Sequence, residues 1–568
     1  MTSMDASTSS SQGLNPMTSA ELGASPISIS ISARPRNRRR CPSWMRLLVV
    51  GVVIGAIEYG PVVSLASLLE IKWQAFDAAL ESGGLGAGLA AAVAVAIVFA
   101  AIAGALVCGL APAAAGSGID KIIEFLGGSS HVGGDPALFS ARTVGVKLVA
   151  IIPTLVAGVA VGREGPAVHI GAGLALLVLR LLPPSGGGDD DLHDAIVIGG
   201  AAGFASTFRA PIGALLYAQE ELSQRWSADI AAQGECRVAW ICRPAPLTLF
   251  PQGMLCAATA AFVIGALQRG NGDQVDFSSI VVFDDEHELF ENTWRYADCP
   301  GFLFLAVATG ALAAAGTKAA VAVRTYRAAQ QRPATVRVAE CAAVAAVTAA
   351  VFVLLPAVYP NCKAVPDSPD DGGHDATHAP RRFVQYTCGE DRYSPLASLS
   401  LVGEEGAIRH LFARDRIVDL DPLAALLFYV AYSLCAVAIL GTAVPAGIFV
   451  PNMMLGATAG RFVGAVVSLA AGGDKYVSDA GVYAMLGAAG ALAGFTRASV
   501  AIVVLLVEIT GDVGLMAPLA AVVVVARYVS SAIQPTGYFH SAVQRWRVAT
   551  PMRTPPRSPR LLGPGESL

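Results

Sequence analysis

The segment Val161-Gly-Arg-Glu-Gly-Pro-Ala-Val-His-Ile-Gly171 places an ionisable pair, Arg163 and Glu164, between the uncharged stretches 148–162 and 165–179. A carboxylate inside a membrane is costly, so an acid at such a position marks a candidate functional site. The glycines and the proline around the pair predict that a helix is broken at the charge and that a new one begins at Pro166. The open amides of a helix start favour an anion. This segment therefore predicts part of an ion pathway.

Bulk composition places the chain among membrane proteins. Of the 568 residues, 54% are hydrophobic and only 14% are charged, whereas a soluble protein of this size carries about 25% charged residues. Uncharged runs long enough to span a bilayer extend from Ser82 to Ile119 and from Pro422 to Gly460. We predict an all-α polytopic membrane protein. The net charge of -4 and the lack of a basic stripe with interleaved aromatics argue against a nucleic-acid partner.

Three regions follow from composition along the chain. Residues 1–44 form a Ser-, Thr- and Pro-rich tail that becomes basic, residues 45–547 form the membrane domain, and residues 548–568 form a Pro- and Arg-rich tail. Both tails are predicted to be disordered. Positive flanks beside the first and last apolar segments predict that both termini are cytoplasmic. A targeting peptide is the alternative interpretation of the N-terminal tail.

Many apolar segments are short and begin with glycine or proline. Short, interrupted segments in both halves of a chain are typical of broken helices that meet at a central binding site. The halves divide near the acidic loop 270–299. The first half carries Gly116-Ser-Gly-Ile119 and Gly162-Arg-Glu-Gly-Pro166, and the second carries Gly447-Ile-Phe-Val-Pro451. An inverted repeat is plausible, although the halves have no strong residue-level similarity.

An anion inside a membrane needs hydrogen-bond donors that replace its water without trapping it. The Ser117 hydroxyl, the amides near Ile448 and Phe449, and the hydroxyl of Tyr538 are candidate donors, with Pro451 suited to a first helical turn. Each signal alone is weak, because a lone Gly-Ser-Gly is more often a simple turn. Their coexistence with the Arg163–Glu164 segment makes an anion site the stronger interpretation.

A second acidic pair, Glu220 and Glu221, ends a short apolar helix that begins at Pro211. The simpler interpretation is two acids at the membrane–water boundary. The functional interpretation is a proton acceptor at the mouth of a pathway.

The ten cysteines form no CxxC pair and no Cys/His cluster at metal-ligand spacing, so the sequence predicts neither a metal site nor a cofactor. Cys362 and Cys388 lie in the long polar loop 360–421. They form a disulfide if that loop faces an oxidising compartment, and free thiols are the equal alternative.

The ordered motifs resemble the CLC family of chloride channels and proton-coupled anion transporters. Connecting segments are also similar, including Phe208-Arg-Ala-Pro211 and Gly494-Phe-Thr-Arg497, and the resemblance covers about residues 45–547. It implies the CLC-type fold of broken, tilted helices in two inverted repeats. It also implies a homodimer in which each subunit has its own pathway.

The resemblance implies a role for each motif residue. Ser117 and Tyr538 would coordinate the central anion with their hydroxyls, together with the amides of Ile448 and Phe449. The implied anion-binding set also contains Gly118, and the implied pathway-lining residues are Gly116, Arg163, Gly165, Pro166, Gly447 and Pro451. Of these, Arg163 is expected to be a structural and electrostatic neighbour of the gate.

Two glutamates carry the expected mechanism. Glu164 would be the gating glutamate, which occupies the anion path when ionised and swings out when protonated. Glu221 matches the glutamate that collects cytoplasmic protons in the family's exchangers, whereas family channels usually have an uncharged residue there. Both acids together favour Cl⁻/H⁺ antiport, and a CLC-type voltage-gated chloride channel is the alternative.

The sequence also departs from the family pattern. Asp120 and Lys121 stand where proline, often followed by glutamate, is usual, and the charge of Asp120 is expected to weaken anion binding at Ser117. Serine at 117 favours chloride over nitrate. Only about 20 residues follow Arg547, so CBS domains are expected to be absent and nucleotide control is doubtful. The loop around Tyr393 resembles the plant and lysosomal-type branch, which favours an intracellular vacuolar or lysosomal-type membrane.

Two further functional classes, an intramembrane enzyme and a transport-dead scaffold, have less support in the sequence. An intramembrane enzyme would need a catalytic set around His169, but no HExxH, paired aspartates or nucleophile–base set accompanies it. We therefore expect no enzyme activity and regard His169 as a packing residue. A transport-dead scaffold would rest on Asp120.

Overall fold

The computed structural model describes residues 44–126, 137–182, 189–222, 245–269, 294–365, 383–389, 391–414, 420–472 and 477–549. These residues belong to one compact unit that spans Pro42–Leu568. The two tails, apart from the residues next to the membrane domain, and most of the acidic loop 270–299 lie outside the described residues.

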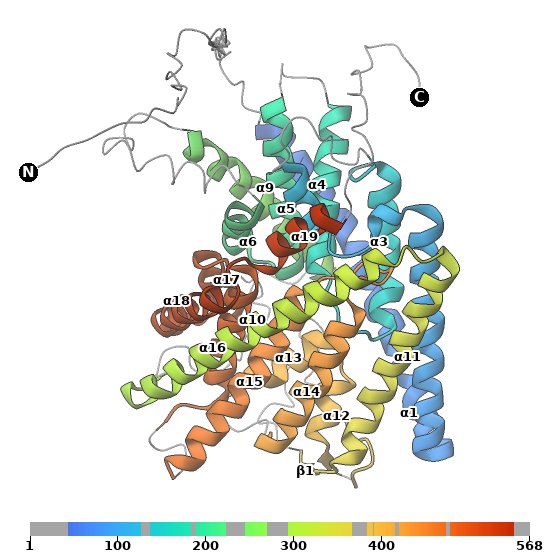
Figure 1. The fold of residues 1–568 in the computed structure, drawn as a ribbon, viewed down its shortest axis with the longest axis vertical. Coiled ribbons are helices and arrows are strands. Elements are labelled where there is room, and N and C mark those ends of the chain that lie inside the picture. The colour runs from blue at the N-terminus through green and yellow to red at the C-terminus, as the bar shows by residue number, and fades with distance from the viewer. Residues whose placement is uncertain are drawn as a thin grey trace, which may run out of the picture. The chain divides into compact units, whose positions relative to one another are not determined.

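The described chain is built almost entirely of helices. In Figure 1, α11, α14 and α15 run side by side. The first-half elements are α1 (Trp44–Leu110), η1 (Pro112–Ala114), α2 (Ile119–Leu126), α3 (Ala141–Val156), α4 (Glu164–Leu181), α5 (Asp189–Phe208), α6 (Pro211–Tyr217), the π-helical turn η2 (Ala218–Leu222) and α9 (Ala245–Arg269). The second-half elements are η5 (Tyr296–Asp298), α10 (Cys299–Ala329), α11 (Ala334–Val358), β1 (Lys363–Ala364), β2 (Arg392–Tyr393), α12 (Pro395–Ser400), α13 (Glu404–Phe412), α14 (Pro422–Ile439), α15 (Phe449–Ala470), α16 (Ala480–Thr496), α17 (Val500–Thr510), η6 (Val513–Leu515), α18 (Met516–Ile533) and α19 (Tyr538–Ala549).

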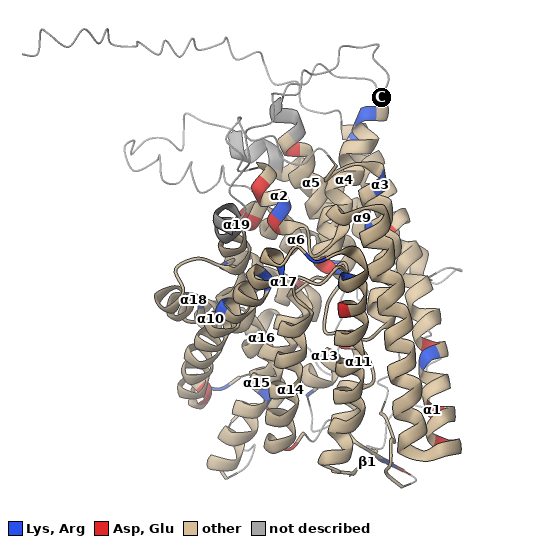
Figure 2. Ribbon diagram, turned by 45° about the vertical axis from the view of Figure 1, so that its right-hand side comes forward, with Lys and Arg blue, Asp and Glu red and all other residues tan. Residues whose placement is uncertain are grey.

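The helices have the length and composition of membrane spans. Among the described residues, eight helical stretches are long and apolar enough to cross a bilayer, and α16 and α17 are shorter apolar helices. Charged residues are sparse along the long helices in Figure 2. The prediction of a polytopic helical membrane protein agrees with this arrangement.

The first helix is longer than its apolar pattern predicts. The sequence indicates separate segments at 45–70 and 86–115, but α1 continues through the polar stretch between them and breaks only at Gly84, which has φ of 65°. Lys72 stabilises this polar stretch by donating from Nζ to the carbonyl of Val156 at 2.9 Å, at the end of α3. A helix C-terminus leaves carbonyls without partners, so the lysine satisfies one of them.

Two helix pairs approach closely through glycines, one pair in each half. A Cβ on Gly171 of α4 would lie 2.8 Å from the Cα of Gly203 of α5. A Cβ on Gly487 of α16 would lie 2.9 Å from the Cα of Gly460 of α15. Small residues let membrane helices pack backbone to backbone. Because α4 and α15 each follow one of the glycine motifs, this repeated packing fixes both motifs against rigid partners.

The polar loop after α11 is closed by a disulfide. Cys362 and Cys388 are bonded, with their Cα atoms 5.8 Å apart, and the short strands β1 and β2 pair antiparallel beside them. The free-thiol alternative is therefore wrong. In Figures 1 and 2 this hairpin lies at one end of the helices, away from α19. Disulfides persist in oxidising compartments, so this end is expected to face an exterior or a lumen.

Replacing both bonded cysteines by serine (Cys362→Ser with Cys388→Ser) is expected to lower the free energy of unfolding by about 2–4 kcal/mol, because the crosslink constrains the unfolded chain. Thermal unfolding of the purified protein with and without reductant measures the change. Cys299→Ser, which removes an exposed free thiol, is the control and should leave the midpoint unchanged. Equal midpoints for the double variant and the unmodified protein would contradict the prediction.

Candidate functional site

Three glycine-containing loops from distant parts of the chain are joined by backbone hydrogen bonds. Gly162 and Gly447 exchange two bonds, each of 2.9 Å, and form an isolated antiparallel bridge. The amide of Gly116 donates to the carbonyl of Val444 at 2.8 Å. The motifs of both halves therefore meet at one place, as the sequence predicts.

Each loop leads directly into a helix. Helix α2 begins at Ile119, α4 at Glu164 and α15 at Phe449. The N-cap residues of α4 and α15, Arg163 and Ile448, make no side-chain capping bond. Amides in the first turn of a helix have no partner within the helix, so they remain available to an anion.

The predicted start of α4 was two residues late. The helix begins at Glu164, so Pro166 is its third residue, and Pro451 is likewise the third residue of α15. Proline lacks an amide donor, which costs nothing in a first turn whose amides have no helical partner. The Glu164 carboxylate thus belongs to the first turn itself, where the helix dipole favours negative charge.

The Gly-Ser-Gly loop lies directly on the start of α4. A Cβ on Gly165 would lie 2.9 Å from the Cβ of Ser117 and would collide with its hydroxyl. Gly118 has φ of +92°, and a Cβ there would lie 2.5 Å from Nδ1 of His169. His169 also donates from Nε2 to the carbonyl of Leu138 at 3.0 Å. The histidine therefore packs beneath the loop, as expected.

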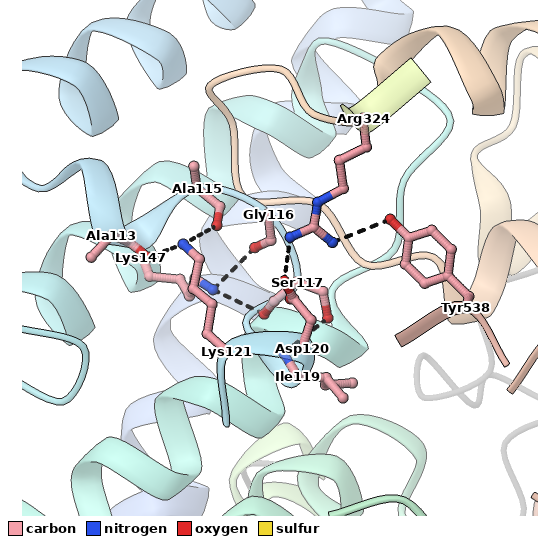
Figure 3. A network of polar contacts seen from close by, with 10 residues as sticks. All are labelled: Ala113, Ala115, Gly116, Ser117, Ile119, Asp120, Lys121, Lys147, Arg324 and Tyr538. Atoms are coloured by element: carbon pink, nitrogen blue, oxygen red, sulfur yellow. Dashed lines mark hydrogen bonds and ion pairs between the residues drawn. The ribbon is translucent and has the colours of Figure 1, made fainter. Parts of the chain in front are cut away.

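Two lysines bind the carbonyls of this loop, as Figure 3 shows. Lys147 of α3, which is fully buried, donates to the carbonyls of Gly116 at 3.0 Å and Ser117 at 2.9 Å. Lys121 donates to the carbonyls at both ends of 113–115, at 2.8 and 3.0 Å. The lysines neutralise carbonyl dipoles that would repel an anion and add positive charge near the loop.

Asp120 is paired with a cation that the sequence does not place beside it. It forms an ion pair with Arg324 of α10, and a second guanidinium nitrogen lies 3.5 Å from the hydroxyl oxygen of Tyr538 (Figure 3). The sequence predicts that the charge of Asp120 weakens anion binding, but it does not reveal that Arg324 is the counterion of this acid. Because Arg324 donates to the Tyr538 oxygen, the tyrosine's own hydrogen stays free for another acceptor.

The Glu164 carboxylate lies where the first and last loops meet. A Cβ on Gly447 would lie 3.1 Å from its Oε2, and the side chain is only 3% exposed. Oε2 has no hydrogen-bond partner among the residues that the structure describes. The carboxylate is therefore buried against backbone with one of its two oxygens unbonded.

Arg163 points to other partners. Its guanidinium lies 3.0 Å from the Glu405 carboxylate and donates to the carbonyl of Thr207 at 3.3 Å. Glu58 of α1, which is buried, lines the same small cavity as Arg163. Arg163 thus pairs with an acid and lies beside Glu164 in the sequence, which agrees with its expected place as an electrostatic neighbour.

The second acidic pair divides into two different environments. Glu220 accepts bonds from the amides of Ser499 at 2.6 Å and Val500 at 3.1 Å, at the start of α17. Glu221 is 4% exposed, and its Oε1 has no hydrogen bond and lies 3.7 Å from Nδ1 of His540. Glu221 is therefore buried and does not lie at a boundary exposed to water. Glu220 instead caps helix α17.

An aromatic cluster fills the space beside Phe449. The ring centroid of Phe449 lies 5.3 Å from that of Phe204, 5.5 Å from that of Phe208 and 5.6 Å from that of Tyr217. Tyr217 is in α6, one turn before Glu221. The cluster is therefore the packing link between the loop of Phe449 and the helix that carries Glu221.

The structure thus joins most of the predicted residues and adds new ones. The loop residues that lie together are Gly116, Ser117, Gly118, Arg163, Glu164, Gly165, Pro166, Gly447, Ile448, Phe449 and Pro451. Tyr538 is connected through Arg324, and Glu221 lies on a separate helix. Arg324 was missed, although an acid inside an apolar region, here Asp120, indicates that a cation must lie nearby.

Comparison with known proteins identifies the family. The family model described as "Voltage gated chloride channel" matches residues 99–531. The chain belongs to this family, the CLC family. It is therefore a multi-pass membrane protein of a family of channels and transporters, and the predicted fold class and the absence of an enzyme role agree with this membership.

Relatives and solved structures extend the comparison. The chain is 28% identical over 443 residues to chloride channel protein CLC-d of Arabidopsis thaliana, covering 75% of this chain and 53% of the relative. It is 26% identical over 500 residues to the human H(+)/Cl(-) exchange transporter 7, covering 86% of this chain and 58% of the relative. The chain thus spans between half and three fifths of the length of these relatives.

Two crystal structures have a similar fold. A eukaryotic CLC transporter aligns with a TM-score of 0.62 at 20% identity, covering 89% of this chain and 74% of the other. A slow cyanobacterial Cl⁻/H⁺ antiporter aligns with a TM-score of 0.66 at 16% identity, covering 89% and 98%. The CLC-type fold is therefore confirmed.

The Asp120–Arg324 pair makes a prediction about stability. Asp120→Asn or Arg324→Gln alone should lower the free energy of unfolding by roughly 1–3 kcal/mol, because each leaves a largely buried charge without its partner. The double variant should lose less than the sum of the two. Thermal unfolding of all three variants gives this coupling as a double-mutant cycle.

Lys318→Gln, at an exposed position of the same helix, is the control for the loss of a positive charge and should leave stability unchanged. Additive losses in the double variant would mean that the ion pair contributes nothing to the fold.

Proposed function

We propose that this chain is a proton-coupled chloride antiporter, in which anions cross a membrane through a pathway that Glu164 gates. The observation that carries the proposal is the pair of buried carboxylates, Glu164 and Glu221. Each has an oxygen without a hydrogen-bond partner among the described residues. They lie on different helical elements, Glu164 at the start of α4 and Glu221 in η2.

The anion site has the chemistry that chloride requires. The starts of α4 and α15 offer backbone amides, and the hydroxyls of Ser117 and Tyr538 supplement them. Lys121, Lys147 and Arg324 contribute positive charge that is already bonded to protein oxygens. Such bonded cations attract an anion without forming a tight ion pair that would trap it. The resemblance to the family, in which serine at the position of Ser117 implies chloride rather than nitrate, supports chloride as the transported anion.

The gate follows from the position of Glu164. An ionised carboxylate at the start of α4 is in the field that would otherwise bind the anion, so the two compete for one place. Protonation removes the negative charge, so the attraction between the Glu164 side chain and the start of α4 becomes weaker. Each proton that reaches Glu164 therefore admits an anion.

The disulfide and α19 support an assignment of the two ends of the protein to different sides of the membrane. The Cys362–Cys388 bond supports an oxidising compartment at the end away from α19. Glu221 lies beside His540 of α19, which would put this acid nearer the cytoplasmic side. We propose an intracellular membrane with the disulfide in the lumen, and a homodimer in which each subunit moves its own ions.

The relatives support coupled transport without deciding it. One is named an H(+)/Cl(-) exchange transporter, another a chloride channel protein, and the cyanobacterial structure is that of an antiporter. The discriminating experiment is reconstitution of the purified protein in vesicles, with a chloride electrode and a pH electrode recording together. Chloride movement with opposite proton movement supports the antiporter. Chloride movement without any proton movement would make the protein a CLC-type channel.

Glu221→Gln is expected to keep chloride movement and to reduce proton movement by about a hundredfold or more, because an amide cannot carry a proton between water and the interior. The two electrodes measure both fluxes from the same vesicles. Glu220→Gln is the matched control, since this neighbour caps α17, and it should retain coupling. Equal proton-to-chloride ratios in both variants would remove Glu221 from the mechanism.

Glu164→Gln is expected to give chloride movement that no longer depends on pH and drives no protons, because the amide imitates the protonated gate at every pH. Chloride flux between pH 5 and pH 8 measures the effect. The unmodified protein should move chloride faster as the pH falls, since protonation opens the gate. Persistence of that pH dependence in the variant would show that another group is the gate.

A further inference from the structure

Tyr217 has a buried hydroxyl that the fold does not use. The side chain is 1% exposed, and its oxygen has no hydrogen-bond partner among the described residues. Buried hydroxyls nearly always find a partner, because leaving one unsatisfied destabilises the protein. An unsatisfied hydroxyl in the interior therefore calls for a functional explanation.

The ring of Tyr217 is held in place by packing. It stacks on Phe204 with centroids 4.7 Å apart and planes 13° apart, and it meets Phe449 edge-on at 5.6 Å. These contacts restrict the direction of the hydroxyl and leave the ring little room to turn toward bulk water. The oxygen is thus kept at one place inside the protein.

Tyr217 is connected to Glu221 by a shared helical segment and to the neighbourhood of Glu164 by its contact with Phe449. Tyr217 precedes Glu221 by four residues on the continuous helical segment of α6 and η2, so the two side chains lie on nearly the same face, about one turn apart. Phe449, which touches the ring, follows Gly447, whose backbone lies against Glu164.

The route between the two acids is otherwise apolar. Phe204 and Phe449 pack against the tyrosine, and Phe208 packs against both of these rings. None of the three side chains can accept or donate a proton. A phenol hydroxyl does both, since its oxygen accepts while its hydrogen is donated. Tyr217 is therefore suited to carry a proton across this aromatic cluster.

We propose that the hydroxyl of Tyr217 relays protons between Glu221 and Glu164. This inference rests on the proposed antiport. In one transfer, the carboxylic acid of Glu221 gives its proton to the tyrosine oxygen while the tyrosine's own proton passes to the Glu164 carboxylate. Tyr217 stays neutral, Glu221 becomes ionised and Glu164 becomes protonated, so charge and atoms balance. A water molecule in either gap would serve the same transfer, and rotation of the hydroxyl resets the relay.

Tyr217→Phe tests the relay because it removes only the oxygen and keeps the stacked ring. In the vesicle assay, proton movement should fall about tenfold or more, as expected for loss of a proton-transfer group. Chloride movement should stay within about twofold of the unmodified protein, because the anion-binding groups are unchanged. The thermal midpoint should stay equal or rise, since an unsatisfied buried hydroxyl has been removed.

Tyr528→Phe, the same change at an exposed position of α18, is the control and should alter neither flux. Coupled transport by the unmodified protein together with unchanged coupling in Tyr217→Phe would overturn the relay alone. Absence of proton movement in the unmodified protein would overturn the antiporter and the relay together. A variant that loses stability and both fluxes would also overturn the relay, since the hydroxyl would then be structural.

Discussion

The backbone bridge between Gly162 and Gly447 is the contact on which the site depends. It joins the loops that precede α4 and α15, two helices that are far apart in sequence and that begin within two residues of the bridge. Their first-turn amides can converge on one anion only if the loops lie in direct contact. A side chain on either glycine would meet the Glu164 carboxylate. The bridge therefore fixes both the helix starts proposed to bind the anion and the position of the proposed gate, Glu164.

Several other buried charges in the described residues have partners, whereas the buried Glu58, like Glu164 and Glu221, has a carboxylate oxygen without a hydrogen bond. Asp120 pairs with Arg324, and Asp512 lies 2.5 Å from the guanidinium of Arg414. Lys147 is satisfied by two carbonyls. Membrane interiors strongly disfavour isolated charge, so such pairing is what a stable fold requires. A carboxylate with an unbonded oxygen costs stability, and the roles proposed for Glu164 and Glu221 give that cost a function.

The features that could be predicted from the sequence are those that depend on neighbouring residues. A glycine motif fixes where a loop ends and a helix starts within a few residues, so Ser117, Glu164 and Phe449 were found as candidates before their contacts were known. The error at Pro166 was of the same local kind, because proline is compatible with any position of the first turn.

Long-range pairings were beyond the sequence. Arg324 is separated from Asp120 by 204 residues, and no periodic pattern links them. The unsatisfied hydroxyl of Tyr217 could not be recognised either, because tyrosine in an apolar helix normally indicates packing. The family resemblance supplied the roles of Glu164 and Glu221, whereas only the structure separates Glu220, which caps α17, from its neighbour.

Coupling two ions requires that their routes share one point and differ elsewhere. The hydroxyl of Tyr538, with Ser117, belongs to the route that offers anion donors, and Arg324 adds positive charge there. Protons would meet positive charge along that route and would be repelled by it. Glu221 begins a different route, with Tyr217 among apolar rings that give an anion no donors apart from one hydroxyl. In the proposed exchange the two routes meet at Glu164, which a proton and an anion use in turn.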